Sequence, residues 1–243
     1  MSDITNDFID VVKARRDFRD FGWAEIADIW IKSFTESVIQ NVVRNVKFLN
    51  CFRIAGEHTE LSDEQLKALS GEQQQQLFQQ IHTAASQGNG YLYARRAIDD
   101  NSDKIDVGAL HQAFAWLKSE ATLDLIKDIT GKQDIITVSC MATRFSQGQF
   151  ITREKASDRD SANRLGFIID LSPHWQSDWG GLLQLHSTSM ANEPASAFTP
   201  AFNSLLLFDA GRDFSLSYVA PFIKYYRYTL MGWFSTSAHE TQL

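Results

Sequence analysis

The chain has 243 residues, of which 44% are hydrophobic and 22% charged, and its formal net charge is −7. This composition is that of one soluble globular domain with a sizeable core. An acidic pI near 5.3 argues against nucleic acid or an anionic membrane as a partner, because both attract clusters of Lys and Arg. No apolar run approaches the roughly 20 residues that span a bilayer.

Further exclusions concern targeting and cysteine chemistry. The N-terminal residues lack the basic and then apolar plan of a signal peptide. The two cysteines, Cys51 and Cys140, are too far apart in sequence for a metal knuckle or a redox pair. We therefore expect a reduced, cytoplasmic protein.

The N-terminal half has mainly helical periodicity. Apolar residues at helical spacing predict helices over 6–18, 33–46, 62–86, 107–118 and 121–129, the third interrupted at residues 70–71. Ser33 followed by Glu36, and Ser62 followed by Gln65, have the spacing of a capping box at a helix start. Gly131 is placed to end the last helix.

The strands of this half are fewer. The pattern over residues 24–30 fits either a helical turn or a short strand. Residues 91–97 alternate and predict a strand, and residues 99–106 predict a polar loop. From residue 134 onward the period changes from helical to alternating. We therefore expect one domain over 1–243, with a mainly helical support region in 1–133 and a β core in 134–243.

One segment of this core carries a recognisable motif. It reads Gly-Gln-Phe-Ile-Thr-Arg-Glu-Lys-Ala over residues 148–156. In an extended strand Phe150, Thr152, Glu154 and Ala156 share one face. Downstream lie a Gly-Gly at 180–181, Pro-Ala-Phe-Asn at 200–203, an alternating segment from Phe214, and Arg-Tyr-Thr-Leu-Met-Gly-Trp at 227–233.

These segments resemble the core of the iron(II)/2-oxoglutarate-dependent oxygenases, in the branch related to prolyl hydroxylases. The resemblance implies an α+β fold, in which a double-stranded β-helix (jelly roll) is braced by N-terminal support helices. Members carry Gly-x-Phe-Leu-x-x-His-x-Asp, a second His further on, and an Arg-x-Ser before Gly-Trp.

The resemblance also implies where the metal ligands would fall. Aligned without gaps, the first His falls on Glu154, the Asp on Ala156 and the second His on Phe214. An iron(II) facial triad needs two imidazoles and a carboxylate, whereas these residues supply one carboxylate, a methyl group and a phenyl ring. We therefore expect no bound iron.

Arg227 falls on the arginine that holds the far carboxylate of 2-oxoglutarate in the family, with Thr229 in place of the Ser. An arginine and a hydroxyl two residues apart on one strand face can bind a carboxylate through a bidentate fork and one further donor. The resemblance thus implies that Arg227 and Thr229 bind 2-oxoglutarate or another small carboxylate. The alternative is an arginine paired with an internal acid, and Glu154 could likewise pair with an arginine and plug the pocket.

Other candidate metal ligands occur among the remaining polar residues. His186 is the best-placed histidine, although a hydrogen-bonded imidazole explains it as well. The loop acids Asp158, Asp160, Asp209 and Asp213 could form a carboxylate-rich Mg²⁺ site, and the alternative is solvated turn residues.

Two functional hypotheses remain. The first is a metal-free pseudoenzyme with an oxygenase fold, which acts as a binding or regulatory protein for a small carboxylate or for a protein partner such as an active relative. The second is an active enzyme, an oxygenase or other, that uses non-standard metal ligation or metal-free chemistry in the same pocket on a small molecule or peptide. The sequence does not identify the substrate, because fold does not specify it.

Overall fold

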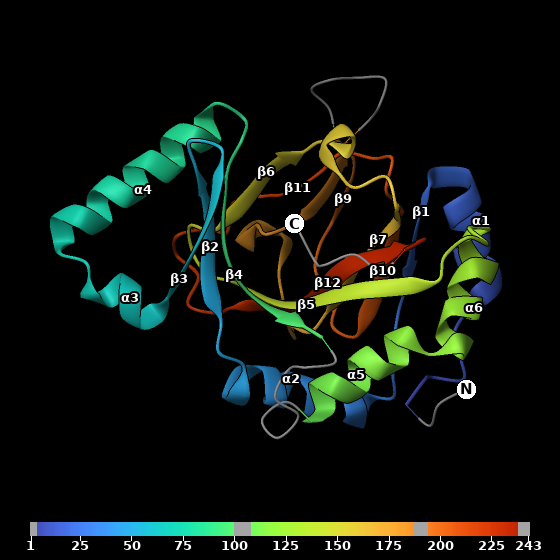
Figure 1. Ribbon diagram of the computed structural model, residues 1–243. Helices are drawn as coiled ribbons and strands as arrows, with labels where there is room; N and C mark the ends of the chain where they lie inside the picture. Colours follow the sequence, from blue (N-terminus) through green and yellow to red (C-terminus); the bar gives the residue numbers. More distant parts are fainter. Residues whose placement is uncertain (1–3, 100–107, 187–193, 238–243) are drawn as a thin grey trace.

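The fold is a curled antiparallel β-sheet with helices packed on its outside (Figure 1). The computed structural model describes residues 4–99, 108–186 and 194–237. Its twelve strands are β1 (Trp23–Ile26), β2 (Leu49–Ile54), β3 (Glu57–Ser62), β4 (Tyr91–Ile98), β5 (Thr137–Phe145), β6 (Phe150–Glu154), β7 (Asn163–Asp170), β8 (Leu183–His186), β9 (Pro194–Phe198), β10 (Ser204–Asp209), β11 (Phe214–Leu216) and β12 (Arg227–Ser235). The α-helices are α1 (Val11–Phe21), α2 (Lys32–Asn45), α3 (Asp63–Ala68), α4 (Gly71–Ser86), α5 (Gly108–Lys118) and α6 (Glu120–Thr130).

The sheet curls into two facing halves, as expected for a jelly roll. The strand order β1-β10-β7-β12-β5-β4 continues through β4 into β6-β11-β8-β9, and β2 and β3 extend from β4. Alternate residues of β12 and β5 turn inward, so that Met141, Phe145, Met231 and Trp233 belong to an apolar cluster between the halves. We call this space the barrel interior.

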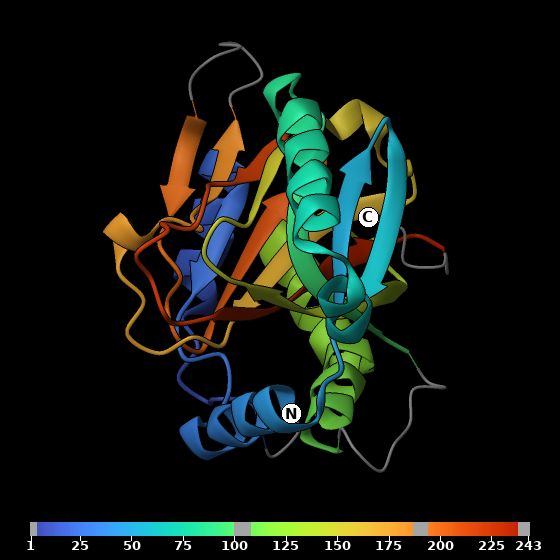
Figure 2. The ribbon, with the colours of Figure 1, turned by 90° about the vertical axis from the view of Figure 1, so that its left-hand side faces the viewer.

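The helices cover the outer face of the larger half. Residues of α1, α2, α5 and α6 pack with the outward side chains of β5, β7, β10 and β12 in a second apolar cluster. Helix α4 lies apart from these helices, beside the β2–β3 hairpin (Figure 2). There Ile81 joins Phe52, Leu92 and Phe150 in a third cluster.

Local signals explain most helix ends. Asp10 caps α1, because its side chain accepts from the Lys13 backbone N–H, and Gly22 ends it at φ +70°. The helix therefore begins later than the predicted 6–18. Ser62 forms a capping box with Gln65, as predicted. Ser70 forms a second one with Gln73, so α4 begins at the predicted interruption at residues 70–71.

One predicted cap is wrong. Helix α2 begins at Lys32 after Ile31, which offers no side-chain cap, so Ser33 already lies within the first turn. The reason is that the backbone N–H of Ile31 pairs with the Ile4 carbonyl oxygen, which fixes the start of the helix through tertiary contact. Gly131 ends α6 in the left-handed region, as predicted.

The strands of the N-terminal half are part of the same sheet. Of the segment 24–30, residues 24–26 belong to β1, which pairs with β10, and Trp30 forms an isolated bridge with Thr5. Strand β4 pairs with both β5 and β6. The β2–β3 hairpin was not predicted; it turns at Ala55 and Gly56, both at positive φ. The loop predicted over 99–106 lies, apart from residue 99, outside the described residues.

Candidate functional site

Glu154 and Phe214, two of the positions where the resemblance places metal ligands, are neighbours in the sheet; we call Glu154, Ala156 and Phe214 the inherited ligand positions. Strands β6 and β11 are antiparallel neighbours, and Glu154 lies opposite Phe214 in the register. The gap-free reading of the sequence thus brings together positions that are far apart in the chain. Ligand-type side chains at these positions would lie close together.

The strand alternation predicted for residues 150–156 is nevertheless wrong in two respects. The pairing of β6 with β11 is irregular between Phe214 and Leu216, which lie opposite Glu154 and Ile151. The Ile151 side chain therefore belongs to the barrel interior, whereas the Phe150 side chain packs with Ile81 of α4. Strand β6 also ends at Glu154, and Ala156 opens a 3-10 turn in which its backbone N–H donates to Asp213 Oδ1 at 2.8 Å.

Phe214 is packed as a core residue. Its side chain is 2% exposed, and its ring lies 5.7 Å from that of Phe208 and 6.1 Å from that of Trp233, centroid to centroid. A phenyl ring has no lone pair for a metal. The aromatic contacts give this position a packing role in the interior.

A cation already lies on this aromatic surface. The Arg159 guanidinium carbon is 5.1 Å from the Phe214 ring centroid and 5.0 Å from that of Trp233. Its Nη atoms donate to the carbonyl oxygens of Glu154, Ala210 and Arg212 at 3.0, 2.5 and 2.7 Å. Burial lowers the pKa of Arg159. The three residues at the ligand positions therefore do not fit an iron(II) ion, because they supply one carboxylate and no imidazole, and the Arg159 guanidinium lies beside them.

Glu154 has an arginine of its own. Its Oε1 lies 3.8 Å from Nη1 of Arg53, and the carboxylate is 26% exposed. Burial raises the pKa of Glu154, and the positive charges of Arg53 and Arg159 oppose that rise. Glu154 thus takes part in an ion pair between β6 and β2. Whether this pair plugs a pocket stays a prediction.

This raised pKa gives a pH-dependent prediction for Glu154→Gln. The folded protein holds the Glu154 proton more tightly than the unfolded chain, so ionisation costs stability as pH rises from the ordinary glutamate range through the raised pKa. The free energy of unfolding of Glu154→Gln minus that of wild type should therefore be more positive at neutral pH than at acidic pH. Urea denaturation at both pH values measures this; an identical difference at both values would contradict it.

Arg227 lies in the barrel interior with an internal acid. It is 1% exposed; its Nε and Nη2 donate to Asp170 Oδ1 at 3.1 and 2.8 Å, and its Nη1 donates to the Gly181 carbonyl oxygen. Burial raises the pKa of Asp170, and Arg227 opposes the rise. Thr229 shares a hydrogen bond of 2.5 Å with Thr143.

Arg227 and Thr229 are therefore partnered by the chain itself, which corresponds to the internal-acid alternative. Carboxylate binding by these two residues stays a prediction. The Gly-Gly segment borders Arg227, because the Gly181 carbonyl oxygen accepts from it. Both glycines are at positive φ, and a Cβ on Gly180 would lie 2.0 Å from the Tyr218 carbonyl oxygen.

The substitute ligands considered from sequence do not converge. His186 is on the face of β8 opposite to the inward Leu185, and its Nε2 lies 2.8 Å from Ser215 Oγ. Asp213 binds Arg153 and Asp209 binds Lys132, at 2.8 and 2.7 Å. Asp158 and Asp160 make local contacts to Ser157 and to the backbone of Ala162. In the described part of the chain, the metal-type side chains that do converge are Cys51, His58 and Glu60.

Part of the chain matches a known protein family. Residues 140–235 match the family described as the 2OG-Fe(II) oxygenase superfamily. No curated protein matches.

Three solved structures have the same fold at low identity. A Pseudomonas putida prolyl-4-hydroxylase has a TM-score of 0.60 at 16% identity, over 94% of this chain and 100% of that one. A Burkholderia pseudomallei oxidoreductase of the 2OG-Fe(II) oxygenase family has 0.62 at 12%, over 96% and 93%. A Trichoplax adhaerens prolyl hydroxylase, solved with a peptide fragment of the hypoxia inducible factor oxygen degradation domain, has 0.61 at 17%, over 93% and 89%.

Residues 140–235 are thus similar to the 2OG-Fe(II) oxygenase superfamily, and the chain has the fold of the prolyl hydroxylases. The jelly-roll fold predicted from the sequence is confirmed. Within the described residues, no helix is both long and apolar enough to cross a bilayer.

The sequence analysis missed Arg159 and Asp170 in the barrel, and it missed the convergence of His58 and Glu60 with Cys51 on the hairpin. Arg159 follows the motif in a segment without periodicity, and Asp170 is a partner of Arg227 over 57 residues. His58 and Glu60 alternate on β3, but only the missed hairpin would have set them beside Cys51.

Proposed function

We propose that this protein is a pseudoenzyme with an oxygenase fold whose pocket at Glu154, Ala156 and Phe214 holds no metal, and that it has a binding or regulatory role in the cytoplasm. The observation that carries the proposal is the Arg159 guanidinium stacked on Phe214 and Trp233. A facial triad must direct three lone pairs at one ion. Here the inherited positions direct one partly buried carboxylate, and a guanidinium takes the cationic role.

The state of Arg227 supports the same proposal. In the family pattern this arginine receives the carboxylate of a keto acid, whereas here Asp170 supplies a carboxylate from within the chain. An external carboxylate would have to displace Asp170 and would gain no metal contact. We therefore propose that 2-oxoglutarate, or a similar small carboxylate, binds weakly at Arg227 and Thr229 and is not consumed.

The partner in this role is proposed to be a protein, such as an active relative. The inference follows from the retention of a packed barrel without its metal ligands.

The test is turnover of 2-oxoglutarate. Protein incubated with iron(II), 2-oxoglutarate, ascorbate and oxygen should form no succinate above a blank without protein. The supporting control is a known active 2-oxoglutarate oxygenase under the same conditions. Succinate that increases in proportion to this protein would contradict the proposal, and it would favour the enzyme with non-standard ligation.

A further inference from the structure

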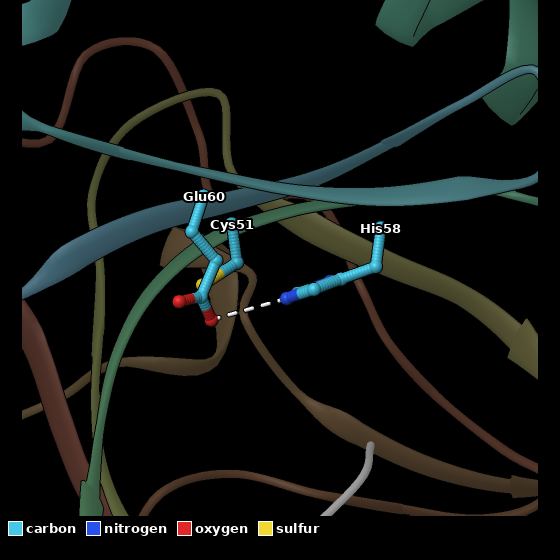
Figure 3. Close-up of side chains that lie close together, drawn as sticks. All are labelled: Cys51, His58 and Glu60. Carbon is cyan, nitrogen blue, oxygen red and sulfur yellow. Dashed lines mark hydrogen bonds and ion pairs between the residues drawn. The ribbon is translucent and has the colours of Figure 1, made fainter.

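The β2–β3 hairpin carries a cluster of three side chains of metal-binding type. Cys51 comes from β2, and His58 and Glu60 come from the facing strand, with Cys51 opposite Glu60 in the register (Figure 3). Their ligand atoms all lie within 4.8 Å of one another. Glu60 Oε1 lies 3.4 Å from Cys51 Sγ and 3.1 Å from His58 Nε2. None of the three occupies an inherited ligand position.

The donor set is one that zinc uses in proteins. A thiolate, an imidazole and a carboxylate are all ligands of Zn²⁺, which favours four-coordinate sites. Cys51 lies at the buried end of the cluster, and the side chains of His58 and Glu60 are 35% and 30% exposed. An ion can therefore enter from the solvent side, and water can fill the fourth position.

Neighbouring hydrogen bonds orient two of these side chains. His58 Nδ1 lies 2.5 Å from the Tyr91 hydroxyl, so an Nδ1–H that donates to Tyr91 leaves the Nε2 lone pair facing Glu60. Arg95 Nε donates to Glu60 Oε1 at 2.8 Å. Metal-bound imidazoles and carboxylates in proteins are oriented by such outer contacts.

We propose that Cys51, His58 and Glu60 form a Zn²⁺ site, with water as the fourth ligand. This inference goes beyond the proposed function, because it concerns the hairpin and not the inherited pocket. The metal would join β2 to β3 where Cys51 reaches the apolar cluster of the barrel interior. Its failure would leave the metal-free reading of Glu154, Ala156 and Phe214 untouched.

Metal entry requires two local changes. The Cys51 thiol loses its proton to solvent as the Zn–S bond forms, so one proton is released for each ion bound. Arg95 Nη2, now 3.0 Å from His58 Nε2, gives up that contact while its Nε keeps Glu60. The thiolate and the Glu60 carboxylate bring two negative charges to the ion, while Arg95 stays paired with Glu60. The nearby Arg53 is compensated by Glu154 at 3.8 Å.

Cobalt(II) titration of the reduced full-length protein tests the proposal. Co²⁺ is a spectroscopic probe for Zn²⁺ sites, because a cobalt–thiolate bond gives a near-ultraviolet charge-transfer band. We expect one Co²⁺ per chain, with this band, and its displacement by Zn²⁺. Cys51→Ser should abolish the band and weaken binding by more than about 100-fold, since even outer contacts of metal ligands are worth about 10–100-fold.

The controls separate the site from general effects. His58→Gln changes a partly exposed side chain and should weaken binding by more than about 10-fold without loss of the fold. Cys140→Ala and His186→Gln remove the other cysteine and a histidine outside the cluster, and both should bind as wild type does. The proposal is overturned by wild type that binds no Co²⁺ or Zn²⁺, by binding without the thiolate band, or by a band that survives in Cys51→Ser.

Discussion

Asp170→Ala is expected to lower the free energy of unfolding by about 3–5 kcal/mol, because it leaves the Arg227 guanidinium buried without a counter-ion. Arg227 is 1% exposed and Asp170 is also buried, so bulk solvent screens the unpaired guanidinium only weakly. Arg227→Met in addition should restore much of the loss, since it removes the uncompensated charge. Urea denaturation of the two single variants and the double variant measures the coupling.

The exposed pair Arg15 and Asp128 is the matched control. Both side chains are 53% exposed, so Asp128→Ala should cost less than about 1 kcal/mol. Asp170→Ala with a cost as small as that of Asp128→Ala would show that the interior pair contributes little.

A smaller variant at the same position tests the predicted carboxylate site at Arg227. Asp170→Gly leaves space beside the guanidinium, and acetate, which has the size of the lost carboxymethyl group, should raise its melting temperature. The effect should vanish when Arg227→Met is added. Acetate without effect on Asp170→Gly, in a variant shown to be folded, would mean that Arg227 accepts only its own chain's carboxylate.

The second large effect is expected from restored ligands. Glu154→His, Ala156→Asp and Phe214→His together rebuild the family's donors, but Arg159 still lies over the place of the Phe214 ring, where the new imidazole would stand. A guanidinium about 5 Å from the doubly charged ion costs roughly 7 kcal/mol at an effective dielectric constant of about 20, or roughly 10⁵-fold in affinity. Adding Arg159→Ala should therefore strengthen iron(II) binding over the triple variant, by up to about that factor.

Two comparisons make this experiment decisive. Arg159→Ala alone removes the cation without restoring ligands, and it should bind no iron in the pocket. Equal affinity of the triple and quadruple variants would show that Arg159 moves away freely. Folded variants that stay without iron would show that the pocket geometry has departed from a facial triad.

The resemblance to the oxygenases predicted the jelly roll and assigned Glu154 and Phe214 to one site, because it aligned both with the metal ligands of that family; the structure sets them opposite each other. The sequence did not predict the β2–β3 hairpin, whose turn at Ala55 and Gly56 lacks the Asn-Gly or Asp-Gly signal. Nor did it predict the register shift that separates Phe150 from the interior, since a bulge leaves no periodic trace.

Charged partners were the hardest to predict. Arg227 could be assigned to a carboxylate by its spacing from Thr229, but whether that carboxylate was a ligand or Asp170 depends on contacts across 57 residues. Arg159 is held by three carbonyl oxygens and two rings from separate segments. Such contacts exist only after the strands have paired, so no local pattern reports them.

The most direct test of the metal-free pocket is anaerobic iron(II) titration in the presence of 2-oxoglutarate, followed by the visible charge-transfer band of the iron–keto acid chelate. The protein carries Cys51→Ser, so that iron at the hairpin cluster does not contribute. We expect no band with this protein and a band with the quadruple variant in the same background. A band of one iron per chain with Glu154, Ala156, Phe214 and Arg159 unchanged would contradict the account.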